Sequence, residues 1–102
     1  MTDALTPRIE INLAKIAHNA AKLVEIYGAK SIMLMGVTKT VCGAPEIARI
    51  LLEQGIQMLA DSKLANLQRM RSEGSEANFV LLRSPALSEV DSVIRHADIS
   101  IN

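Results

Sequence analysis

The sequence has few aromatic residues and a single cysteine. Its 102 residues contain one Phe, one Tyr and no Trp. One cysteine excludes a framework of internal disulfides and is typical of proteins from a reducing compartment. The apolar residues are instead mostly Ala, Leu, Ile, Val and Met, which favour helices and parallel strands over an aromatic-rich antiparallel sandwich.

Neither sign of charge is in excess, because Lys plus Arg and Asp plus Glu number 11 each. The sequence therefore lacks the basic surface that nucleic acid requires and the acidic tail that a basic partner would favour. No apolar run reaches the length that spans a membrane, and the first residues do not have the regions of a signal peptide. We expect a cytoplasmic protein with no nucleic-acid or membrane partner.

Most sequence signatures of catalytic and cofactor sites are also missing. There is no Gly-x-Gly-x-x-Gly fingerprint, no P-loop, no His-Glu-x-x-His and no Cys-x-x-Cys. The two histidines and the cysteine are not spaced as metal ligands, and no serine lies in a nucleophile elbow. We expect no metal site, and the remaining candidate is one lysine at the end of a predicted strand.

The apolar residues predict alternating strands and helices. Apolar stretches begin near Ile32, Ile56, Phe79 and Ile99, and residues at helical spacing lie between them. This alternation predicts a parallel sheet with crossover helices. From the pattern alone, the sheet belongs either to a β/α barrel or to an open doubly wound fold.

The first segment has a different pattern. Ile9, Ile11 and Leu13 alternate with polar residues, which predicts a half-exposed strand over residues 8–13. Asn12 is a residue type that caps helices, and helical spacing of apolar residues continues from Leu13 to Tyr27. We therefore expect a strand followed directly by a helix.

Lys39 follows the apolar run of residues 32–37, where a buried strand gives way to a loop. In parallel α/β folds, ligands bind at this carboxyl end of the strands. Burial there would lower the pKa of the Lys39 ammonium and favour the neutral amine that Schiff-base chemistry needs. The alternative is a rim lysine whose amine reaches water.

Other polar residues follow the later strands. Arg83 could bind a substrate carboxylate or a cofactor, or it could face solvent. Asn102 could contact a cofactor at the end of the last strand, or it could be a frayed chain end. For Asp61 we favour a helix-capping role over a ligand, and for Cys42 an ordinary reduced thiol.

Several short motifs together resemble the alanine racemase N-terminal domain family. They are Arg-Ile-Glu-Ile-Asn-Leu at 8–13, Val-Thr-Lys at 37–39, Asp-Ser-Lys at 61–63, Leu-Leu-Arg-x-Pro at 81–85 and Ala-Asp-Ile-Ser-Ile-Asn at 97–102. Their details are similar to the ornithine-racemase-type branch. Alanine racemases proper carry Tyr and Gly soon after the lysine, whereas Thr-Val-Cys-Gly follows Lys39 here.

This resemblance implies a (β/α)8 TIM-type barrel that binds pyridoxal phosphate. Lys39 would be the lysine that forms the internal aldimine and moves the α-proton of an amino acid. Arg83 and Asn102 would be cofactor-binding residues. The amino acid itself, whether alanine, ornithine or another, is not indicated by the motifs.

A complete barrel of this type needs roughly 250 residues. We therefore expect residues 1–102 to form the N-terminal portion of one barrel domain, with about half of its strands. The phosphate-binding loops and the family's carboxy-terminal β-domain, which brings a second base, would lie outside it. We expect this portion alone to be inactive and to bind the cofactor weakly or not at all.

Two alternatives to a racemase stay open. One is a non-catalytic pyridoxal-phosphate carrier of the same fold, and the other is an α/β interaction module without a cofactor. In each case an open half-barrel would have unpaired strand edges, which recruit further strands. We therefore expect a homo-oligomer in which a second copy covers the edges.

Overall fold

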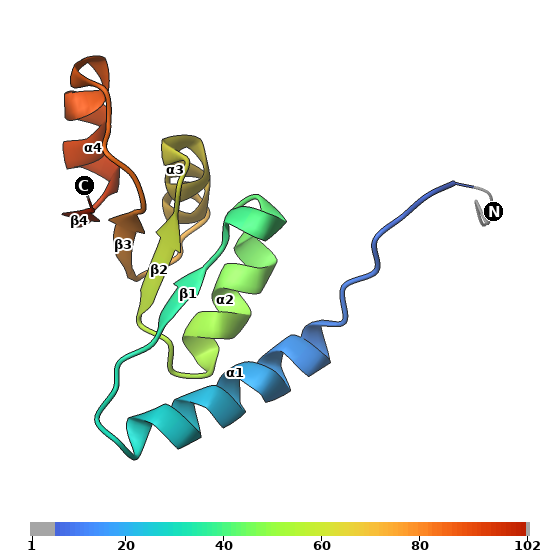
Figure 1. The fold of residues 1–102 in the computed structure, drawn as a ribbon. Helices are drawn as coiled ribbons and strands as arrows, with labels where there is room; N and C mark the ends of the chain where they lie inside the picture. Colours follow the sequence, from blue (N-terminus) through green and yellow to red (C-terminus); the bar gives the residue numbers. More distant parts are fainter. Residues whose placement is uncertain (1–5, 102) are drawn as a thin grey trace.

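The computed structural model describes residues 6–101, and in this part of the chain strands and helices alternate (Figure 1). Two short 3-10 helices, η1 (Lys39–Val41) and η2 (Leu87–Glu89), follow β1 and precede α4. The helices and strands, in chain order, are α1 (Leu13–Gly28), β1 (Met35–Val37), α2 (Pro45–Glu53), β2 (Met58–Asp61), α3 (Leu64–Ser72), β3 (Asn78–Leu81), α4 (Val90–His96) and β4 (Ile99–Ser100).

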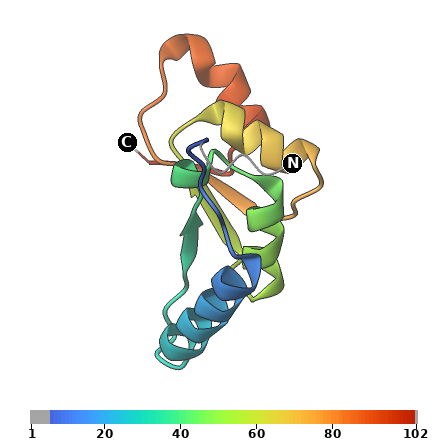
Figure 2. The ribbon, with the colours of Figure 1, turned by 90° about the vertical axis from the view of Figure 1, so that its right-hand side faces the viewer.

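The strands form one parallel sheet in the order β1-β2-β3-β4. Met35 pairs with Met58 at one end of the β1–β2 ladder, and Leu59 pairs with Phe79 between β2 and β3. Both views show the helices in chain order along the sheet, from α1 at one end to α4 at the other (Figures 1 and 2). The parallel α/β sheet predicted from the apolar stretches is confirmed.

A compact apolar core lies between the sheet and the helices. Because side chains alternate along a strand, every second residue of β2 and β3 faces the helices. Gly36 permits a close approach on this face, since a Cβ atom there would lie 3.0 Å from Leu51 Cδ1. The fully buried core residues are Ala48, Leu59, Leu67, Met70, Phe79 and Leu81.

The helix starts follow the sequence rules. The Asn12 side chain accepts a hydrogen bond from the Lys15 backbone N–H (3.1 Å), so the predicted cap of α1 is confirmed. Pro45 occupies the first turn of α2, where its missing N–H is not needed. These local signals determine where α1 and α2 begin.

The predicted strand over residues 8–13 is wrong. This segment has no strand structure and leads away from the sheet (Figure 1), and Ile9 is 90% exposed. A strand requires a hydrogen-bonded neighbour, and no described residue pairs with this segment. Ile32 and Met33 likewise lie outside β1, because its pairing with β2 begins only at Met35.

The described part of the chain is more open than a closed domain. Its radius of gyration is 15.2 Å, whereas a compact domain of this size has about 13 Å. Many large apolar side chains outside the core are exposed, among them Val37 on β1 and Ile99 on β4. None of the helices within residues 6–101 is long and apolar enough to cross a membrane.

The core makes a stability prediction. Leu67 is 0% exposed and Leu87 is 92% exposed, so Leu→Ala at the two positions makes the same chemical change in opposite surroundings. We expect Leu67→Ala to lower the free energy of unfolding by about 2–5 kcal/mol and Leu87→Ala to change it by less than about 0.5 kcal/mol. Urea unfolding followed by circular dichroism measures both, and equal losses would contradict the assignment of the core.

Candidate functional site

The carboxyl ends of the parallel strands bring the candidate residues to one edge of the sheet. Lys39 begins η1, two residues after β1 ends, and Arg83 lies two residues after β3. Asn102 falls outside the described residues. Lys39 is exposed, and no hydrogen bond or ion pair between described residues includes its amine. Of the two alternatives for Lys39, the described residues show the rim lysine whose side chain reaches water, because the open sheet does not enclose its edge.

Asp61, the last residue of β2, lies at the centre of a buried hydrogen-bond network. The Thr38 hydroxyl donates to Asp61 Oδ2 (2.9 Å), and the Ala60 carbonyl is a second acceptor at 3.2 Å. Asp61 Oδ1 accepts from the Lys63 backbone N–H (2.9 Å) and from Asn66 Nδ2 (3.1 Å). One carboxyl group thus connects the residue before Lys39 to the first turn of α3.

We refer to residues 38–43 as the Lys39 loop. The Thr38 carbonyl accepts hydrogen bonds from the backbone N–H groups of Val41 (3.2 Å) and Gly43 (3.0 Å), which close the loop. Gly43 has φ +62°, and a Cβ atom there would lie 2.7 Å from Asn66 Cβ. Only glycine fits both the left-handed conformation and this contact with α3.

The Arg83 guanidinium binds two neighbouring loops. Its Nε donates to the Ser62 carbonyl (2.7 Å), and its two terminal nitrogens lie 3.0 and 2.9 Å from the Glu89 carboxylate oxygens. Glu89 also accepts from the Ala86 backbone N–H (2.9 Å). The hydrogen bonds from Arg83 and then from Ala86 lower the pKa of Glu89 from 4.5 to about 2, and the same pairing raises the pKa of Arg83.

Sequence reasoning missed three residues of this edge. Glu89 and Asn66 are not among the residues named from the sequence, and Thr38 is named only within the Val-Thr-Lys motif. Asn66 carried a usable signal, because it lies one turn before Met70 on the buried stripe of α3. The expected capping role of Asp61 is partly confirmed, since its carboxyl holds the Lys63 N–H, although the N-cap position belongs to Lys63.

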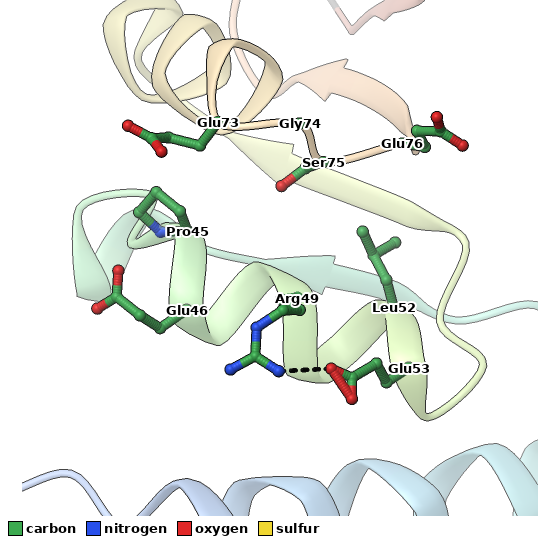
Figure 3. A pocket seen from close by; sticks show the side chains of 9 residues that line it. All are labelled: Pro45, Glu46, Arg49, Leu52, Glu53, Glu73, Gly74, Ser75 and Glu76. Atoms are coloured by element: carbon green, nitrogen blue, oxygen red, sulfur yellow. Dashed lines mark hydrogen bonds and ion pairs between the residues drawn. The ribbon is translucent and has the colours of Figure 1, made fainter.

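A cavity of about 590 Å³ lies elsewhere, between α2 and the segment that leads into β3 (Figure 3). Charged side chains line it, and Figure 3 shows Arg49 turned toward Glu53 on the same helix, at 2.6 Å. Neither Lys39, Asp61 nor Arg83 lines this cavity. Within residues 6–101, no group of His, Cys, Asp and Glu could hold a metal ion.

The Arg83–Glu89 pair makes a pH prediction. The pKa of Glu89 is lower in the folded chain than its ordinary value, so the pair stabilises the fold above pH 4.5 and loses this effect as the pH falls toward about 2. We expect wild type to have a higher midpoint of thermal unfolding than Glu89→Gln at pH 6, and the difference to vanish near pH 2.

Glu53→Gln is the control, because it makes the same change of charge at an exposed arginine pair on α2. Circular dichroism at a series of pH values gives the midpoints. A difference between wild type and Glu89→Gln that stays constant from pH 6 to pH 2 would contradict the pairing.

Comparisons with known proteins show the family to which the chain belongs. The family model described as "Alanine racemase, N-terminal domain" matches residues 11–102. A lysine racemase from Thermotoga maritima is 41% identical over 92 residues, which are 90% of this chain and 26% of that protein. An ornithine racemase from Acetoanaerobium sticklandii is 33% identical over 99 residues, covering 94% of this chain and 27% of that protein.

A solved structure has the same fold. The alanine racemase from Corynebacterium glutamicum superposes with a TM-score of 0.73 at 22% sequence identity, over 87% of this chain and 27% of that one. The chain therefore spans about a quarter of the length of these relatives. Its parallel sheet corresponds to the N-terminal portion of the alanine racemase barrel, and the chain belongs to the alanine racemase N-terminal domain family.

Proposed function

We propose that the chain is the N-terminal part of a pyridoxal-phosphate-dependent amino-acid racemase in which Lys39 carries the cofactor. The observation that supports this most is the position of Lys39. Its backbone is fixed in η1 at the carboxyl edge of a parallel sheet, and its side chain is exposed. The similar proteins named lysine racemase, ornithine racemase and alanine racemase support the reaction type.

The surroundings of Lys39 are compatible with a lysine that binds a carbonyl compound. A primary amine can condense with the cofactor aldehyde only if it is accessible, and the Lys39 side chain is exposed. When bound, pyridoxal phosphate acts as an electron sink for negative charge at the α-carbon of an amino acid. The part of Lys39 would be to hold the cofactor covalently and to accept or return the α-proton at Nζ.

Arg83 would act at the border of the same site. A guanidinium has five N–H donors. Four of those of Arg83 make hydrogen bonds to described residues, which leaves one N–H on Nη2. That N–H could donate to a carboxylate or a cofactor oxygen. Asn102 stays a proposed cofactor contact, and a cytoplasmic location stays a prediction from the single cysteine.

The two alternatives are distinguished by simple measurements. A pyridoxal-phosphate carrier would absorb visible light but would not exchange the α-proton of any amino acid with deuterium from solvent. An interaction module without cofactor would remain colourless after incubation with pyridoxal phosphate. The names of the relatives favour the racemase, and the higher identity to the lysine racemase than to the alanine racemases favours a diamino acid as substrate.

The proposed role of Lys39 predicts where the cofactor is bound. We expect borohydride reduction of the intact parent protein with pyridoxal phosphate, followed by peptide mass mapping, to place the label on Lys39. The exposed lysines Lys30 and Lys63 are internal controls, since they differ from Lys39 in position and not in accessibility. Lys39→Arg keeps the charge and should abolish the label. A label mainly on Lys30 or Lys63 would reject the assignment.

We propose further that this chain forms a homo-oligomer. β1 and β4 are the edges of the described sheet, and each bears an exposed apolar side chain, Val37 and Ile99. Unpaired edges with apolar residues associate readily. We expect sedimentation velocity at micromolar concentration to give a dimer or larger species. Val37→Lys should shift the population toward monomer, and a compact wild-type monomer would contradict the proposal.

A further inference from the structure

The polar side chains between the Lys39 loop and α3 are deeply buried. Thr38 and Asp61 are 0% exposed and Asn66 is 5% exposed. Polar groups are costly to bury without hydrogen bonds, and here Thr38 and Asn66 donate to different oxygens of Asp61. A satisfied buried network of this kind fixes the segments that it joins in one arrangement.

From this arrangement we propose that Asp61 is a positioning residue for Lys39. It fixes the Lys39 loop against the start of α3, and so determines where the Lys39 amine lies at the carboxyl edge of the sheet. The claim that Asp61 sets the position of the amine rests on the proposed function, whereas the claim that Asp61 fixes the loop does not.

The hydrogen bonds give Asp61 a hold on the first residue of the loop. Thr38 donates to Asp61 through its side chain, and through its carbonyl it accepts the two N–H groups that close the loop. Lys39 is the next residue, so movement of Thr38 moves the Lys39 backbone directly. Asp61 does not contact Lys39 itself, and at this end of the loop it acts through Thr38.

The other end of the loop depends on the same carboxyl group. Gly43 packs on Asn66, and the Asn66 amide is held by Asp61 Oδ1 at 3.1 Å. The Arg69 side chain, one turn further along α3, donates to the Cys42 carbonyl. The C-terminal end of the loop thus rests on α3, whereas Thr38 at its start is held by Asp61 at the end of β2.

Hydrogen–deuterium exchange on the 102-residue chain tests the hold on the loop. Thr38→Val removes the hydroxyl at nearly constant volume. We expect the N–H groups of Val41 and Gly43 to exchange about fivefold faster or more, because one buried hydrogen bond is lost. The N–H groups of β3 report global unfolding and should change much less. Thr38→Ser keeps the hydroxyl and should restore slow exchange.

Asn66→Ala is an independent variant, because it removes a different donor to Asp61 and keeps the Cβ atom that Gly43 contacts. It should accelerate loop exchange in the same way, so the test does not depend on one variant folding. If loop exchange is unchanged relative to β3 in both Thr38→Val and Asn66→Ala, the proposal is overturned.

Trapping of pyridoxal phosphate with borohydride in the intact parent protein tests the position of the amine. We expect the yield on Lys39 to fall about fivefold in Thr38→Val and to recover in Thr38→Ser, while the exposed Lys15 on α1 is labelled equally in all. Faster loop exchange with unchanged labelling of Lys39 would overturn the proposal. If Lys39 is not labelled in the unaltered parent protein, the proposed function fails instead, and exchange alone decides whether Asp61 holds the loop.

Discussion

The carboxyl group of Asp61 is the constraint on which the candidate site depends. It is fully buried at the end of β2, and it accepts hydrogen bonds from the Lys39 loop on one side and from α3 on the other. A buried carboxyl group without such partners would destabilise the fold strongly. Both of its oxygens accept hydrogen bonds, and these bonds form only while Thr38 and Asn66 keep their positions beside it.

The loops at the carboxyl edge are joined in sequence, each to the next. Asp61 connects the Lys39 loop to the loop after β2, and Arg83 connects that loop to the segment before α4 through Ser62 and Glu89. The apolar core beneath the helices holds the strands, but it does not reach these loops. Polar contacts across the edge therefore fix the loops of the site relative to one another, and the Arg83–Glu89 ion pair is one of these contacts.

The sequence predicted those features that depend on local patterns. The alternation of strands and helices and the Asn12 cap both follow from residues close together in the chain. The strand over residues 8–13 failed because pairing is non-local and alternation alone cannot supply a neighbour. The Thr38–Asp61 hydrogen bond spans 23 residues, so only the three-dimensional arrangement reveals it.

The position of Lys39 and the surroundings of its amine have different origins. Residues 38–69 contain the hydrogen bonds that fix the Lys39 loop, so this portion of the family fold suffices to orient the lysine backbone. The amine itself is exposed, because the described sheet is open beside it. In a closed barrel, further strands surround that edge and exclude water. Local polar contacts therefore place the Lys39 backbone without a closed barrel, whereas the surroundings of its amine would depend on further strands.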